Sequence, residues 1–189
     1  MKLKSPLFIA LALLIIVGSV FRVAGLAPQI AMAIFGAAVI KDKRLAFALP
    51  LISMLISDVI YQLLYVLGYM PYSGFYTGAS FYDSQVLNYV LLASLTMFGF
   101  WASNLKLGRI IGATLAAPVF YFIVSNFLVW IGGAGFYRPQ TFEGLMMCYG
   151  DGLPFLRSSL VNTAIFSTVM FGGYFLIHYF MLEKKKQAA

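Results

Sequence analysis

The stretch LAFALPLISMLISDVIYQLLYVL, residues 45–67, decides the fold class of this chain. It is long enough for a helix that crosses a membrane, because a crossing takes about 20 apolar residues. Four of its polar residues are spaced i, i+3, i+4 and i+7, which places them on one helix face. They are Asp58, Tyr61, Gln62 and Tyr65. A face with a carboxylate, an amide and two phenols is expected to contact protein or a water-filled cavity, and not lipid.

The whole chain has the composition of an integral membrane protein. Of its 189 residues, 62% are hydrophobic and 10% are charged, whereas soluble domains average about 25% charged residues. Together with a mean hydropathy of +0.91, these values exclude a soluble enzyme, a disordered chain and a nucleic-acid-binding domain. The net charge of +7 comes from short basic clusters between apolar runs, which is typical of membrane proteins and does not indicate a nucleic-acid partner.

Six apolar segments predict an all-α integral membrane protein with a single transmembrane domain over residues 1–189. The predicted transmembrane helices are residues 5–25, 27–40, 45–67, 85–104, 108–131 and 156–182. The second helix, at about 14 residues, is short for a crossing and is expected to be tilted, extended or partly re-entrant. The first segment also resembles a signal peptide, but Arg22 inside it and Pro28 after the small residues favour its retention.

The basic residues predict which side of the membrane each loop occupies. Ten of the 13 lie on one side and three lie on the other. The larger set is Lys2, Lys4, Lys41, Lys43, Arg44, Lys106, Arg109, Lys184, Lys185 and Lys186, and the smaller set is Arg22, Arg138 and Arg157. The side with more basic residues is expected to be cytoplasmic, so both termini are predicted to face the cytoplasm. The outer side then has two long loops, residues 68–84 and 132–155.

Polar residues gather at one depth of the predicted bundle. With a rise of about 1.5 Å per residue, six of them from five helices reach the outer third of the membrane. These are Arg22, Asp58, Gln62, Asn88, Asn126 and Asn162. We therefore predict an outward-facing polar pocket beneath the two outer loops. One alternative stays open: Asp58 pairs with Arg22 and joins the first helix to the third, while the asparagines bridge helices.

Other candidate residues give weaker signals. Cys148 lies in the predicted outer loop. Three interpretations of its thiol stay open: a small buried apolar group, a reactive thiol, or a ligand of a soft metal. Because it is the one cysteine, an internal disulfide is excluded. The sequence contains no Ser/His/Asp set, no HExxH and no phosphate-binding loop, so we expect neither an enzyme nor a cofactor or metal centre.

Three stretches of the sequence carry a resemblance to known proteins. They are APQIAMAIFGAAVIKDKRLAFALPLISMLISD (27–58), SNFLVW (125–130) and YRPQTFEGLMMCYGDGLPFLRSSL (137–160). Their pattern is similar to an uncharacterised bacterial family of small six-helix membrane proteins. That family resembles the S components of energy-coupling factor (ECF) transporters, which bind vitamins or metal ions from the outer side of the membrane.

The resemblance implies an S-component-like bundle and an energy-coupling membrane subunit with ATPases as a partner. It also implies that the binding site includes Asp58, Asn126, Trp130, Cys148 and Tyr149. Residues 5–25 lack the Ala-x-x-x-Ala stripe with which S components dock on the coupling subunit. The alternative that the protein works without such a coupling module therefore stays open.

The sequence supports three functions to different degrees. The leading hypothesis is binding and uptake of a small solute, vitamin-like or metal-containing, with the lipid bilayer and the solute as partners. Asp58 then contacts the solute or holds Arg22 for an anionic one, and a cobalt ligand at Cys148 is a special case. The second hypothesis is a structural or assembly subunit of a larger membrane complex. The third is an intramembrane enzyme, for which no catalytic set is recognisable.

Overall fold

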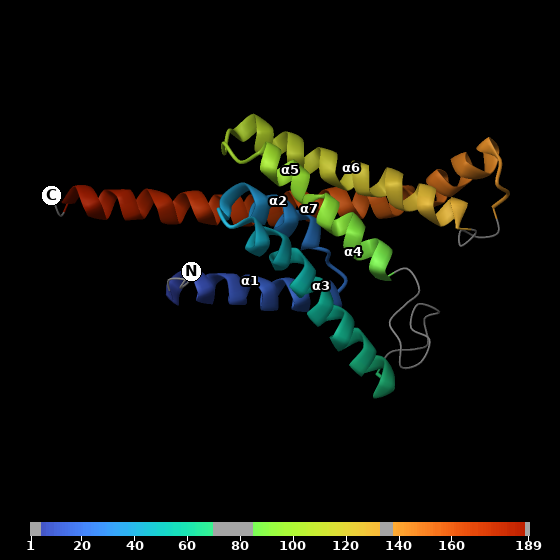
Figure 1. The fold of residues 1–189 in the computed structure, drawn as a ribbon, viewed down its shortest axis with the longest axis horizontal. Coiled ribbons are helices and arrows are strands. Elements are labelled where there is room, and N and C mark those ends of the chain that lie inside the picture. The colour runs from blue at the N-terminus through green and yellow to red at the C-terminus, as the bar shows by residue number, and fades with distance from the viewer. Residues whose placement is uncertain (1–4, 70–84, 133–137, 188–189) are drawn as a thin grey trace.

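The computed structural model describes residues 5–69, 85–132 and 138–187, and these residues form seven helices without a strand (Figure 1). The helices are α1 (Ser5–Val23), α2 (Gln29–Val39), α3 (Lys43–Val66), α4 (Gln85–Ser94), α5 (Thr96–Trp101), α6 (Leu107–Ile131) and α7 (Phe142–Gln187). The prediction of an all-α protein is therefore confirmed for this part of the chain. Most of the predicted outer loop 68–84 lies outside the described residues.

Helix α2 forms the centre of the bundle. Nine of its 11 residues are buried, and it contacts each of the other six helices. Small side chains at Ala31, Ala33, Gly36 and Ala37 let the neighbouring helices approach closely. At about 1.5 Å per residue, α2 is about 16 Å long, which is shorter than a bilayer core of about 30 Å.

The described residues do not show all six of the predicted membrane-crossing helices. Three helices are long and apolar enough to cross a membrane: Lys43–Val66, Leu107–Ile131 and the Phe142–Met181 part of α7. The remaining apolar helices among the described residues are shorter, namely Ile9–Val23, Gln29–Val39 and Gln85–Trp101. These lengths and compositions are compatible with a membrane protein.

The predicted helix over residues 85–104 is divided into α4 and α5 at Leu95. Side-chain hydroxyls compete for backbone carbonyls on both sides of this residue: Ser94 Oγ donates to Leu91 O at 2.6 Å, and Thr96 Oγ1 donates to Ala93 O at 2.7 Å. Such bonds locally disturb the regular helical ladder. The α4–α5 pair together covers residues 85–101 and approximates the predicted segment.

The prediction of an outer loop over residues 132–155 is wrong for residues 142–155, which form the first part of α7. Thr141 Oγ1 accepts a hydrogen bond from the Gly144 backbone N–H at 3.2 Å, which caps the helix where it begins. Pro154 lies inside the helix. Because proline lacks an N–H, it bends a helix without necessarily ending it, and Figure 1 shows the first, orange part of α7 inclined to the rest.

Two tight turns close helices at the same end of the bundle. Gly25 after α1 and Gly68 after α3 both have positive φ angles, +86° and +74°. In each turn the next residue donates its N–H five positions back, from Leu26 to Phe21 O and from Tyr69 to Leu64 O. Glycine is the residue that adopts this left-handed conformation at low cost.

The chain alternates in direction, so its connections gather at two ends (Figure 1). The start of α1, the end of α7 and the α2–α3 and α5–α6 turns lie at one end, on the left of the view. The basic residues Lys41, Lys43, Arg44, Lys106 and Arg109 lie in or next to these two turns. The α1–α2 turn, the end of α6 and the start of α7 lie toward the other end (Figure 1). This arrangement agrees with the predicted sorting of basic residues to one side.

Candidate functional site

A buried carboxylate links three helices. Asp58 of α3 is fully buried and forms an ion pair with Arg22 of α1, the Oδ1 atom accepting from Nη1. Its Oδ2 atom accepts from Gln85 Nε2 at 3.0 Å and from Tyr89 Oη at 2.9 Å, both on α4. We call these four residues together with Ser57, whose Oγ accepts from Arg22 Nη1 at 2.6 Å, the Asp58 cluster.

The Asp58 carboxylate finds its counter-charge and its hydrogen-bond donors within the Asp58 cluster. An isolated buried carboxylate costs several kcal/mol, and only a close counter-charge and further hydrogen bonds offset that cost. Here three donors from two other helices surround one carboxylate. The cluster therefore holds α1, α3 and α4 together. The pairing alternative predicted the Asp58–Arg22 contact between α1 and α3, but not the contacts with α4.

Tyr61 supports the arginine from the next turn of α3. Its Oη donates to the backbone oxygen of Arg22 at 2.7 Å. The guanidinium carbon of Arg22 lies 5.5 Å from the centre of the Tyr61 ring, within cation–π distance. The position of the guanidinium is thus determined by its carboxylate partner and by the aromatic ring.

Arg22 also lines a cavity of about 300 Å³, whose lining does not include Asp58 or Tyr61. Its lining comes from every helix except α5 and from the α1–α2 turn. The lining residues are Arg22, Gly25, Ala27, Gln29, Ile30, Met54, Asn88, Leu92, Tyr121, Phe155, Ser158, Ser159 and Asn162. We call this space the Arg22 cavity. It combines one guanidinium, three amides and three hydroxyls with an apolar remainder.

Several of the polar lining groups are already positioned by the protein. Asn88 Oδ1 accepts from Tyr121 Oη at 3.3 Å, which links α4 to α6. Gln29 Nε2 donates to Gly18 O at 3.3 Å. Asn162 is 8% exposed, and its Nδ2 donates to Ser158 Oγ within α7 at 3.3 Å. The cavity walls therefore present amides in fixed orientations.

The Arg22–Asp58 pair is oriented relative to the cavity. The Asp58 side chain is 0% exposed, whereas the Arg22 side chain is 20% exposed and lines the cavity. Asp58 does not line it. The positive end of the pair consequently faces the cavity, and no lining residue carries a negative charge.

The structure separates the predicted site residues into three groups. Arg22, Asn88 and Asn162 line the Arg22 cavity. Asp58 and Tyr61 lie behind the arginine, while Gln62 and Tyr65 continue the same face of α3, partly buried and outside the cavity lining. The third group is Asn126, Trp130, Cys148 and Tyr149, which belong to the α6–α7 hairpin and do not line this cavity.

The third group makes contacts between α6 and α7. Cys148 is 5% exposed, and its Sγ donates to Asn126 O at 3.5 Å. Tyr149 Oη donates to Ile123 O at 3.1 Å, and Trp130 Nε1 donates to Pro139 O at 2.9 Å. These bonds tie side chains to the backbone of the facing segment, as expected for helix packing.

Metal ligands do not gather among the described residues: no group of three His, Cys, Asp or Glu side chains occurs there. One further ion pair joins Arg138 to Asp151 at 2.8 Å, and both side chains are about one-third exposed. This pair links the segment just before α7 to the third turn of α7 and lies apart from the cavity lining.

Sequence reasoning missed several residues of the site. Gln29, Tyr121, Ser158 and Ser159 line the cavity, and Gln85 and Tyr89 bind Asp58. Three of these residues carry a readable signal. Gln29 is the one polar side chain in α2, and Gln85 and Tyr89 are spaced i and i+4, which places them on one face.

Comparisons with known proteins identify a family but no function. No curated protein and no solved structure matches the chain. One family model, described as "Family of unknown function (DUF6580)", matches residues 2–187. Since this match covers nearly the whole sequence, the chain belongs to that family.

Proposed function

We propose that the protein binds a small solute in the Arg22 cavity and takes it up across a bacterial cytoplasmic membrane, in the manner of an S component. One observation carries this proposal: side chains from six helices converge on one cavity that combines a guanidinium, amides and hydroxyls with an apolar wall. Small-molecule sites typically have this composition of a few oriented polar groups within an apolar lining. The cavity lies toward the end of the bundle opposite the basic turns, which the proposal takes as the outer side.

The size of the cavity favours a small solute. Its volume of about 300 Å³ is at the lower limit of ligand pockets. At roughly 30 Å³ per water molecule, this space holds about ten waters. A vitamin-like solute of that size is compatible with the cavity. Cobalt ligation by Cys148 is not supported at this site, because Cys148 is not among the lining residues.

The charge of the cavity favours a solute with an anionic or strongly accepting group. Asp58 holds the guanidinium in place from behind and is not exposed to the cavity. Of the two roles left open for Asp58, the arrangement therefore favours positioning Arg22 over direct contact with a cation. The partners in this proposal are the bilayer, the solute and, by resemblance, an energy-coupling subunit with ATPases.

The proposal is tested by purifying the full chain in mild detergent and identifying small molecules released on denaturation by mass spectrometry. A stoichiometric compound is expected. The Asn162→Ala variant should remain folded and lose this compound, because the Asn162 amide lines the cavity and its described hydrogen bond stays within α7. Thr168→Ala is the matched control, since Thr168 is exposed on the same helix and donates within it to Ala164 O. Equal solute content in both variants would contradict the proposal.

A second candidate function is a structural or assembly subunit of a larger membrane complex. The closed Asp58 cluster favours it, because the most polar group of α3 is used by the protein itself. This candidate predicts an empty cavity, an Asn162→Ala variant with wild-type behaviour and a co-purified protein partner. Asp58 variants do not separate the two functions, since loss of the buried pair disturbs the fold in either case.

A further inference from the structure

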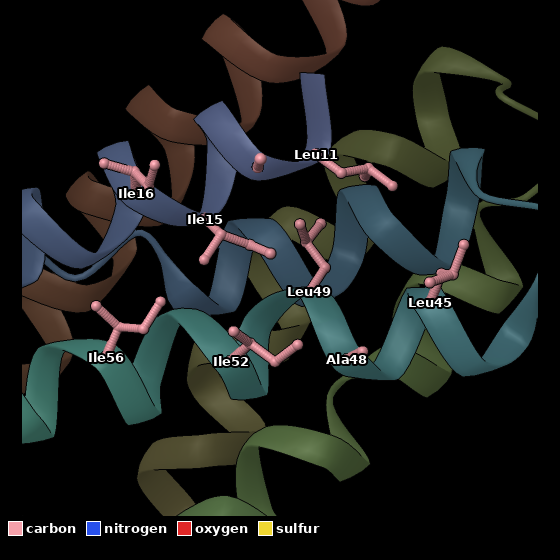
Figure 2. Close-up of a pocket in the computed structure, with 9 residues that line it drawn as sticks. Leu11, Ile15, Ile16, Leu45, Ala48, Leu49, Ile52 and Ile56 are labelled. Atoms are coloured by element: carbon pink, nitrogen blue, oxygen red, sulfur yellow. The ribbon is translucent and has the colours of Figure 1, made fainter. Parts of the chain in front are cut away.

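A second cavity, of about 340 Å³, forms a groove between α1 and α3 (Figure 2). Nine residues line it, and every one of them is aliphatic. Figure 2 shows Leu11, Ile15 and Ile16 on α1 opposite Leu49, Ile52 and Ile56 on α3. A lining without polar side chains does not hold a polar solute, so this groove is distinct in chemistry from the Arg22 cavity.

The dimensions of the groove select its occupant. It extends along α3 from Leu45 to Ile56, which is about 17 Å at 1.5 Å per residue. Over that length a helix about 10 Å across occupies about 1,300 Å³. This exceeds the space in and above the groove, which is about 810 Å³ even when its open side is counted. A helix therefore does not fit inside the groove, whereas a single extended hydrocarbon chain is much narrower.

Positive charge lies at one end of the groove. On α3 the lining follows a stripe through Ala48 and Ile52, and Arg44 occupies the position one turn before Ala48 on that stripe. Lys41, Lys43 and Arg44 are all exposed, and Lys43 Nζ lies 5.9 Å from the Phe100 ring centre. The sole acidic residue of the turn is Asp42, whose carboxylate accepts the Arg44 backbone N–H at 3.0 Å. The turn therefore keeps a positive charge next to the groove.

We propose that the α1–α3 groove binds one acyl chain of an anionic phospholipid, with the lipid phosphate at Arg44. Basic residues beside helices on the cytoplasmic side are known to bind anionic headgroups. This site rests on the membrane location in the proposed function, but it does not depend on a solute in the Arg22 cavity. Lipid occupancy at the start of α3 would then depend on the lipid composition of the membrane.

The test places the full chain in nanodiscs made of equal parts phosphatidylcholine and phosphatidylglycerol. Lipid retained after transfer to mild detergent is then counted by native mass spectrometry. One retained phosphatidylglycerol is expected, with a preference of about fivefold over phosphatidylcholine, as one basic residue near an anionic lipid provides. Arg44→Gln should abolish this preference. Lys106→Gln is the control, because Lys106 is exposed near the same end of the molecule on the turn before α6.

A second pair of variants tests the groove itself. Ala48→Phe fills it and should prevent retention of either lipid, whereas Ala116→Phe makes the same change at an exposed position of α6. If Ala48→Phe fails to fold, the Arg44 and Lys106 variants still decide the question. Equal retention of the two lipids by the wild-type protein, or an equal effect of Lys106→Gln, overturns the proposal. A protein chain retained in place of lipid also overturns it. Asn162→Ala should leave lipid retention unchanged, which separates failure of this site from failure of the solute site.

Discussion

At the scale of single residues, two Asp–Arg pairs in the described part of the chain differ in burial and therefore in their contribution to stability. Asp58 is 0% exposed, whereas the Asp151 side chain is 36% exposed. Removing one partner of a buried pair costs about 3–5 kcal/mol, and an exposed pair contributes about 0–1 kcal/mol. We expect Asp58→Asn to lower the midpoint of thermal unfolding strongly and Asp151→Asn to change it little. Similar midpoints for the two variants would contradict a structural role for the Asp58 cluster.

Residue spacing indicated the polar face of α3 but could not identify what that face contacts. The pairing of Asp58 with Arg22 was one of two interpretations that the sequence left open. The structure adds Gln85 and Tyr89, which approach from α4. Depth along a helix gives no information about rotation around its axis. Asn126 and Asn162 have similar predicted depths, yet only Asn162 lines the Arg22 cavity. Depth alone could not distinguish the two residues.

At the scale of helices, the close approach of α5 to α2 depends on a glycine. A Cβ atom at Gly99 would lie 2.3 Å from Ile34 O and 2.6 Å from the Ala37 Cβ. The backbone of α2 must then move, and overpacking of this kind costs about 1–3 kcal/mol. We expect Gly99→Ala to lower the free energy of unfolding by that amount, measured by denaturant titration in detergent.

Gly173→Ala is the control for this substitution. A Cβ at Gly173 meets nothing within 4 Å, and the residue lies within α7. Alanine favours a helix over glycine by up to about 1 kcal/mol, so this variant should be as stable as the wild-type protein or more stable. If both variants destabilise equally, the close packing of α5 on α2 is not what limits stability.

Helix existence was easier to predict from the sequence than helix length. Each of the six predicted apolar segments is helical in the described part of the chain, although one of them is divided into α4 and α5. Long apolar runs have few alternatives to a helix in a membrane protein. The first part of α7 was missed because its glycines and Pro154 are typical of loops. The capping bond at Thr141 and the close contact of Gly152 with Asn126 instead allow a helix there. Contacts between helices therefore override the local preference.

At the scale of the whole molecule, the positions of the basic turns predict a topology that can be measured. In the structure the α2–α3 and α5–α6 turns lie at one end, with the start of α1 and the end of α7 (Figure 1). The sequence predicts that this end faces the cytoplasm. Single cysteines at Lys41→Cys, Lys106→Cys and Gln140→Cys, in a Cys148→Ala background, probe both ends at exposed positions.

In intact cells a membrane-impermeant maleimide should label the cysteine at position 140 and not those at positions 41 and 106. After the cells are opened, all three should react, which serves as the control for accessibility. Labelling at 41 but not at 106 in intact cells would place the two basic turns on opposite sides. Such a result would mean that the segment between the two turns, from α3 to α5, crosses the membrane an odd number of times, and not twice as predicted. The common basic end, and with it the outward orientation proposed for the Arg22 cavity, would then be wrong.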